Sequence, residues 1–257
     1  MEILKQSNFL KYLDEEEIQL FEIEILKESL GCNNRSVNEI VENLVRIGFL
    51  YRLERGKYCR STFRDENVIG TFLTADGAVA YWSALHLHGL TEQFSNTVFV
   101  QTTKKKNAVS ILGTDYQFIK INPQKRTGIA YNGYGNYKYP ITDVEKTIID
   151  CFDLPRYSGG YAELIRAFYQ ANLNVDKLIN YCNSVNNIAV IKRIGFLAEF
   201  FKKDYLIDFI HFAKTKVNRT YNLFDPFGKT DGELNPEWYL RLNLSKENIL
   251  RISQNLY

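Results

Sequence analysis

The chain has 257 residues, of which 45 % are hydrophobic and 24 % charged, and its net charge is +2. These values predict a folded protein and exclude a disordered, fibrous or uniformly basic chain. The length fits a small domain followed by a larger one. The sequence starts without the features of a signal peptide, and no apolar stretch approaches the ~20 residues that cross a bilayer. We therefore expect a cytoplasmic protein without membrane contact.

The charges are unevenly distributed near the N-terminus. Residues 14–30 are strongly acidic, whereas residues 46–60 are basic. This switch predicts an acidic and a basic face within one small domain. The four cysteines form no Cys-x-x-Cys pair, which indicates free thiols rather than a zinc site or a disulfide framework: Cys32, Cys59, Cys151 and Cys182.

Residues 16–30 carry apolar side chains at three- and four-residue spacing, which predicts an amphipathic helix with a break near Phe21. Gly31 ends this helix, and a short polar turn follows. Ser36 and Glu39 have the spacing of a capping box at the start of a second helix. Its apolar stripe consists of Val37, Ile40, Val41, Leu44 and Val45, and the residues expected to face outward are Arg35, Asn38, Glu39, Glu42, Asn43 and Arg46.

Gly48 ends the second helix, and residues 49–60 form two short stretches of strand-like sequence around a glycine turn, which predicts a hairpin. The order of helix, short turn, helix and hairpin is that of a winged helix-turn-helix. In such domains the second helix enters the major groove and the wing contacts the DNA backbone. The expected DNA-binding residues are Arg35, Ser36, Asn38, Asn43, Arg46, Arg52, Arg55, Lys57 and Arg60.

The middle of the chain has the pattern of mixed helix and strand. Residues 65–88 are expected to be mainly helical, with His86 and His88 as structural histidines because they point to different sides of one helix. Strands are predicted over 97–103, 116–121 and 128–139, the last with a turn at 133–136. The run Lys104-Lys105-Lys106 is either a solvated loop tip or a second phosphate contact.

A helix is predicted to begin after Ile141, with Thr142 as its cap and with Asp143 and Glu145 in its first turn. Further helical patterns follow, and a strand-like tail ends the chain. The expected ranges are 161–172, 175–185, 187–203 and 205–216 for the helices, and 221–224 and 238–244 for the tail. The fold class is therefore α+β: a winged helix-turn-helix over 1–62, then a larger domain over 63–257, mixed to about 160 and mainly helical after it.

Three segments resemble the AbiEi family, whose members are antitoxins and transcriptional repressors of abortive-infection, type IV toxin-antitoxin systems. They are LVRIGFLYRLERGKY (44–58), YWSALHLHGLTEQ (81–93) and ITDVEKTIIDCFDLPRYSGG (141–160), in the family's order and spacing. The resemblance implies autorepression through the winged helix, with binding to inverted repeats in the chain's own promoter. It also implies that the C-terminal domain counteracts a nucleotidyltransferase toxin, functionally if not physically, in defence against phage.

Two other functions stay open. The winged helix could dock a protein instead of DNA. Alternatively, the acids Asp143, Glu145, Asp150 and Asp153 with Lys146 could form a magnesium-dependent nuclease cluster, although helix capping and a solvated helix face explain them with fewer assumptions. The sequence has no nucleophile elbow, phosphate-binding loop or His-Glu-x-x-His motif. We therefore expect no enzyme activity, catalytic residue, cofactor or metal.

Overall fold

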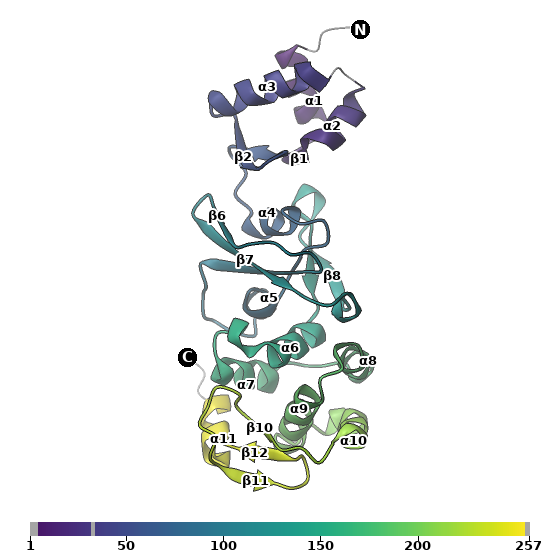
Figure 1. The fold of residues 1–257 in the computed structure, drawn as a ribbon, viewed down its shortest axis with the longest axis vertical. Coiled ribbons are helices and arrows are strands. Elements are labelled where there is room, and N and C mark those ends of the chain that lie inside the picture. The colour runs from purple at the N-terminus through teal and green to yellow at the C-terminus, as the bar shows by residue number, and fades with distance from the viewer. Residues whose placement is uncertain (1–4, 32–33, 255–257) are drawn as a thin grey trace.

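The computed structural model describes residues 5–31 and 34–254 of the chain. The elements stack into an elongated molecule with three tiers: an N-terminal winged helix, a central sheet with short helices, and a mainly helical C-terminal part (Figure 1). The predicted α+β fold class is confirmed. Within the described ranges no helix is both long and apolar enough to cross a membrane.

The N-terminal tier is a winged helix-turn-helix. Its sheet has the order β1-β3-β2 with antiparallel pairing, and the hairpin β2–β3 is the wing. The elements in chain order are α1 (Gln6–Glu15), β1 (Leu20–Glu22), α2 (Ile23–Leu30), α3 (Asn34–Arg46), β2 (Leu50–Glu54) and β3 (Lys57–Arg60).

The expected helix over residues 16–30 is wrong in its first half. Residues 20–22 form β1 instead, and the helix α2 begins at Ile23. The cause is long-range pairing: Phe21 lies opposite Tyr58 on β3, their rings stack at 5.7 Å, and the Ile23 amide donates to the Gly56 carbonyl at 2.8 Å. The helix α1, which was not predicted, buries Phe9 and Leu13 in the same core.

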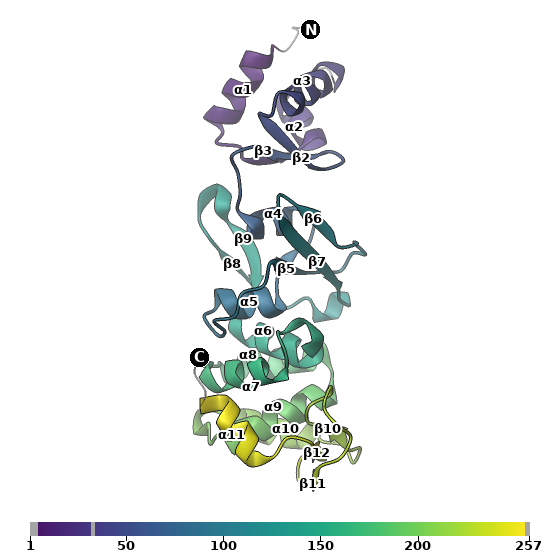
Figure 2. The same ribbon diagram turned by 90° about the vertical axis from the view of Figure 1, so that its left-hand side faces the viewer.

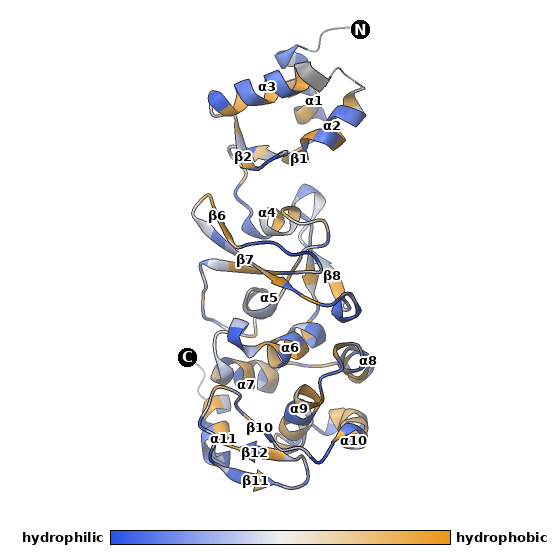
Figure 3. Ribbon diagram, viewed as in Figure 1, coloured by the Kyte–Doolittle hydropathy of each residue, from blue (hydrophilic) through white to orange (hydrophobic). Residues whose placement is uncertain are grey.

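The predicted apolar stripe of the second helix is confirmed, because Val37, Val41 and Leu44 on α3 are fully buried. The helix begins earlier than the capping box indicated. Since α3 starts at Asn34, Ser36 lies inside its first turn and is not the N-cap residue. Figure 3 shows the resulting alternation of hydrophilic and hydrophobic positions along α3.

The central tier is a mixed sheet with the strand order β6-β7-β5-β4-β9-β8. The region 65–88 is not one helical stretch, since the buried strand β4 separates two short helices. An added Cβ on Gly77 would lie 2.8 Å from Thr74 Cγ2 and 3.0 Å from the Thr71 carbonyl oxygen, so any other residue there would displace its neighbours. The elements are α4 (Glu66–Phe72), β4 (Ala78–Val79), α5 (Tyr81–Leu87), β5 (Thr97–Thr102), β6 (Val109–Ile111), β7 (Thr114–Lys120), β8 (Ile129–Asn132) and β9 (Tyr139–Thr142).

The C-terminal tier confirms the four predicted helical regions and the strand-like tail. It adds a strand and a final helix, β11 and α11, that were not predicted. The elements are α6 (Val144–Asp153), α7 (Tyr161–Gln170), α8 (Val175–Val185), α9 (Ile188–Phe200), α10 (Ile207–Lys216), β10 (Asn222–Leu223), β11 (Glu233–Asn235), β12 (Leu240–Leu242) and α11 (Lys246–Gln254).

The buried side chains form three clusters that follow the tiers only in part. Leu53 and Cys59 belong to the wing by sequence but pack with Phe63 and the central strands. The division at residue 62 stays a prediction, because the wing contributes to both cores. Cys59, Cys151 and Cys182 are buried free thiols, and burial raises the pKa of Cys59 to about 11. Cys32 lies outside the described residues.

Candidate nucleic-acid interface

The helix α3 lies at the end of the molecule, with the winged-helix sheet between it and the central tier (Figures 1 and 2). Asn38, Glu39, Glu42 and Arg46 on this helix are exposed to solvent. Its outer face therefore carries amide, carboxylate and guanidinium groups, which are the side chains that read base edges or contact phosphates.

Two wing arginines extend this surface. Arg52 is 46 % exposed, and its Nη1 lies 3.7 Å from Glu42 Oε1 on α3. Arg55 is exposed in the turn of the wing, where Gly56 takes the left-handed conformation with φ +80°. Because Arg52 reaches α3, the helix and the wing form one continuous surface.

Glu42 reduces the positive charge of this surface, and its carboxylate interacts with two neighbouring side chains. Its carboxylate accepts a hydrogen bond from the Tyr58 hydroxyl at 3.3 Å and faces Arg52. Burial raises the pKa of Tyr58 against the opposing charge of Arg52, so the phenol stays a neutral donor at neutral pH. The polar contacts of Glu42 thus brace the wing against α3.

Lys57 and Arg60 hold the wing in place and do not face solvent. The Lys57 side chain is 14 % exposed, lies 3.3 Å from Glu22 and 3.4 Å from Glu54, and donates to the Phe72 carbonyl at 2.8 Å. The Arg60 side chain is 12 % exposed and pairs with Asp14 at 2.7 Å. We expected both residues to contact phosphate. Their internal contacts instead hold them away from the exposed surface of α3 and the wing.

The remaining predicted contact residues differ in their burial and in their hydrogen-bond partners. Asn43 donates to Gln6 Oε1 on α1 at 2.7 Å and accepts from Arg46 at 2.6 Å, so its amide holds two helices together. Ser36 is half-buried. The side chain of Arg35 lies outside the described part of the chain. The strongest candidates for DNA contact are therefore Asn38, Arg46, Arg52 and Arg55.

The sequence missed the role of Gln6 because the helix that carries it was not predicted. The four-residue spacing of Phe9 and Leu13 was the available signal. The three lysines at 104–106 have different environments. Lys106 Nζ lies 2.5 Å from Glu54 Oε2 on the wing, whereas Lys104 and Lys105 are exposed.

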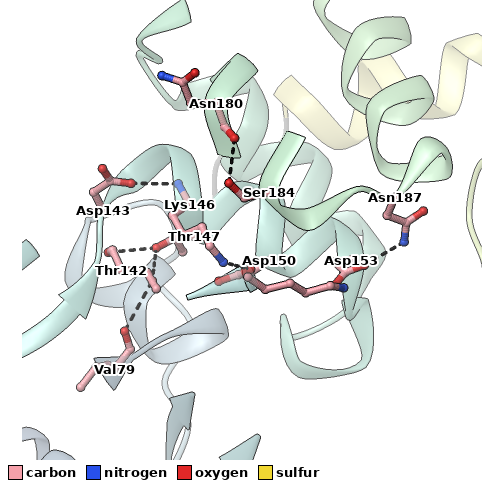
Figure 4. Close-up of polar contacts among 11 residues, drawn as sticks. Val79, Thr142, Asp143, Lys146, Thr147, Asp150, Asp153, Asn180, Ser184 and Asn187 are labelled. Atoms are coloured by element: carbon pink, nitrogen blue, oxygen red, sulfur yellow. Dashed lines mark hydrogen bonds and ion pairs between the residues drawn. The ribbon is translucent and has the colours of Figure 1, made fainter. Parts of the chain in front are cut away.

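The acids of the alternative nuclease cluster lie around α6 (Figure 4). Asp143, not Thr142, caps this helix: its carboxylate accepts from the Lys146 amide at 2.9 Å, whereas Thr142 ends β9. The second oxygen of Asp143 accepts from Lys177 at 3.0 Å and from the Tyr181 hydroxyl at 2.9 Å. Asp143 is therefore committed to the helix start and to α8.

The other three acids also have partners within the chain. Asp150 is buried and pairs with Lys146, whose side chain is fully buried. Burial raises the pKa of Asp150 although the lysine charge opposes the shift. Asp153 accepts from Lys125 at 2.6 Å and from Asn187 at 2.8 Å, and Glu145 accepts from the Asn174 amide at 2.8 Å. Over the described residues, no group of three or more His, Cys, Asp or Glu side chains is placed to hold a metal ion.

The two histidines of the central tier do not meet. His88 Nε2 lies 2.7 Å from the Thr142 carbonyl, which confirms a satisfied structural histidine. The His86 ring packs against Phe94 at a centroid distance of 4.7 Å. The contact of His88 also joins the end of α5 to the start of α6, so residues 81–93 and 141–160 pack together at this junction.

No protein-family model matches the chain, and no curated protein matches it. Among solved structures, Rv2827c from Mycobacterium tuberculosis superposes with a TM-score of 0.65 at 15 % sequence identity. The match covers 98 % of this chain and 95 % of that one. Identity this low carries no information on function by itself. The likeness establishes that the chain shares its fold with Rv2827c over almost its entire length.

Proposed function

We propose that this chain is a DNA-binding transcriptional regulator that represses its own promoter. The observation that carries the proposal is the single exposed surface formed by α3, Arg52 and Arg55 at the end of the molecule. A helix of this kind fits the major groove, and wing cations bind phosphates by charge neutralisation and counterion release. Two copies on an inverted repeat would match the usual half-site arrangement of such repressors.

The antitoxin activity belongs to the same proposal and is assigned to residues 63–257. It is supported by the resemblance of residues 81–93 and 141–160 to the AbiEi family, whose members counteract nucleotidyltransferase toxins. The two segments pack together through His88 and the carbonyl of Thr142. We expect co-expression of the chain to relieve growth arrest by a nucleotidyltransferase encoded next to it. Unrelieved arrest would remove the antitoxin part and leave the regulator.

A promoter-reporter assay in living cells tests the regulator. The chain, supplied in trans, should lower expression from the DNA upstream of its own gene. The variant Arg52→Ala/Arg55→Ala should restore expression, whereas Arg219→Ala/Arg251→Ala, which removes two exposed arginines from the C-terminal tier, should repress normally. Equal repression by all three proteins would contradict a role for the wing.

The alternative is a winged helix that docks a protein. The acids Glu39 and Glu42 on the outer face of α3 favour this reading, since carboxylates repel phosphates. A protein partner that co-purifies with the chain, combined with no effect of salt on binding to any duplex, would replace the regulator with this adaptor.

A further inference from the structure

The loop of the β8–β9 hairpin is unusually rich in exposed aromatic side chains. Tyr131 is 66 % exposed, Tyr134 is 81 % exposed, and Tyr137 is 42 % exposed, all within the sequence YNGYGNY. Exposed tyrosines in one short loop leave apolar surface in contact with water, and such patches often mark sites of interaction. Tyrosine is also enriched in protein interfaces, where its ring packs and its hydroxyl forms hydrogen bonds.

The hairpin is held in a fixed place beside the winged helix. Figure 2 shows it rising from the central tier toward α1. The Asn136 amide donates to the Glu17 carbonyl at 2.7 Å, and the Tyr137 ring stacks on Phe63 at a centroid distance of 5.2 Å. Tyr131 and Tyr134 are therefore presented by an anchored loop, which limits the conformational entropy that a partner would have to remove.

Exposed carboxylates lie beside the tyrosines at the tip of the hairpin. A crevice of about 410 Å³ lies between its tip and the end of α1, and its walls include Asp14, Glu17 and Tyr134. A second crevice of about 460 Å³ at its base includes Tyr131 together with Asp143 and Glu145. Arg60 pairs with Asp14, which is still 67 % exposed, whereas Asp143 and Glu145 at the base are only 15 % and 8 % exposed and both contact Lys177. The exposed negative charge therefore lies at the tip, on Asp14 and Glu17.

The preferred ligand chemistry follows from this combination of rings and acids. Lysine and arginine side chains bind both aromatic faces and carboxylates. The chain itself gives an example, because Lys138 Nζ lies 5.0 Å from the centre of the Tyr131 ring. Nucleic acid could stack on the same rings, but its phosphates would face the carboxylates of Asp14 and Glu17 at the tip of the hairpin.

We propose that the exposed surface of the β8–β9 hairpin, with the crevice at its tip, docks a partner protein through a segment rich in lysine and arginine. This surface is separate from the α3 and wing surface, so it adds a second binding function to the one proposed above. Neither proposal depends on the other.

The test is a fluorescence-anisotropy titration of the full chain into a short labelled peptide of alternating Arg and Gly. The wild type should bind this peptide and not the matching Glu-Gly peptide. Tyr131→Ala/Tyr134→Ala should weaken binding about tenfold, because two cation-π contacts are lost. Tyr131→Phe/Tyr134→Phe keeps the rings and should bind nearly as the wild type does.

A matched control uses two exposed tyrosines of the C-terminal tier, and Tyr205→Ala/Tyr221→Ala should bind the Arg-Gly peptide with wild-type affinity. Glu17→Gln should weaken binding a few-fold and reduce its salt dependence. An unchanged thermal transition and an unchanged far-ultraviolet circular dichroism spectrum of the hairpin variants would show that they are folded. No peptide binding, an equal loss in the control, or displacement of the peptide by oligothymidylate would overturn the proposal.

Discussion

The winged helix and the α6 region use charged residues in opposite ways. In the winged helix, Arg52 and Arg55 remain exposed to solvent, whereas Lys57 and Arg60 form ion pairs within the chain. Around α6, Asp150 and Lys146 are buried together and Asp153 is paired with Lys125. Both regions looked like candidate sites in the sequence. The difference teaches that a charged motif can contact a partner only where burial and internal pairing leave its groups accessible to solvent.

The comparison is tested most strongly by removing one member of the buried pair. Asp150→Ala leaves the Lys146 ammonium without its partner in the core, and we expect the free energy of unfolding to fall by about 3–5 kcal/mol. Urea denaturation measures this change. The double variant Lys146→Met/Asp150→Leu should recover most of the loss, since an apolar pair can replace a buried ion pair.

Substitutions at Asp150 also distinguish a structural role of this residue from a catalytic one. We expect no magnesium-dependent cleavage of plasmid DNA by the wild type, because each acid is engaged elsewhere. Cleavage by the wild type that folded Asp150→Asn abolishes would return the nuclease to consideration. A loss of less than about 1 kcal/mol in Asp150→Ala would contradict the structural role of the pair.

Asp76 sharpens the comparison with a carboxylate that is only partly buried. Burial opposes its ionisation, but hydrogen bonds from Thr102 and Thr103 and the charge of Arg126 outweigh burial and lower the pKa to about 2. A pKa below the ordinary 3.8 means that the ionised group stabilises the fold above about pH 4, and that this contribution disappears as the pH falls through 2.

We therefore expect Asp76→Asn to lose about 2 kcal/mol at neutral pH relative to the wild type. Denaturation curves over a range of pH measure the difference between the two proteins. The difference should shrink below pH 4, because the wild type then loses the same interaction. A difference that is constant down to pH 2 would show that the carboxylate charge is not the cause.

The wing offers exposed and buried cations within one hairpin. Arg52→Ala/Arg55→Ala should weaken binding to all DNA sequences about tenfold and reduce the salt dependence, since each lost phosphate contact changes the slope by about 0.9. Lys57→Ala should instead lower stability, because it breaks contacts with Glu22, Glu54 and Phe72. Gel shifts over a salt series, together with thermal unfolding, distinguish the two effects. Weaker DNA binding by a stable Lys57→Ala variant, with unchanged DNA binding by Arg52→Ala/Arg55→Ala, would contradict these roles.

Asn38 should have the smallest effect in this series. It is exposed on the outer face of α3, where an amide can pair with an adenine edge. Asn38→Ala should cost about 1 kcal/mol on the preferred site and little on unrelated DNA, so its main effect is relaxed sequence choice. Competition gel shifts with single-base variants of the site measure this change. Equal weakening on every sequence would assign Asn38 to phosphate contact instead.

Local patterns predicted the elements whose burial follows a simple period. The stripe of α3 and the helix α8 were found in this way. The strand β1 was missed because it forms only through pairing with β3, whose paired residues lie 35 to 39 positions away in the sequence. The order of the six-stranded sheet likewise depends on crossovers that periodicity does not encode.

The candidate interface was predictable as a region but not residue by residue. Arg52, Arg55, Lys57 and Arg60 look alike in the sequence, and only the folded chain places the last two against Glu22, Glu54 and Asp14. Two of those acids lie on α1 and β1, the elements that were not predicted. Because α1 and β1 were not predicted, the sequence could not reveal these internal partners of Lys57 and Arg60.

Binding of DNA by α3 and the wing can be tested in solution. The most direct measurement is a gel-shift titration of the full chain against the DNA upstream of its own gene, at low and moderate salt, with an unrelated duplex as competitor. We expect a shift that resists the competitor and weakens steeply with salt. Binding that is absent, or equal for both duplexes at every salt concentration, would contradict specific DNA recognition by this winged helix.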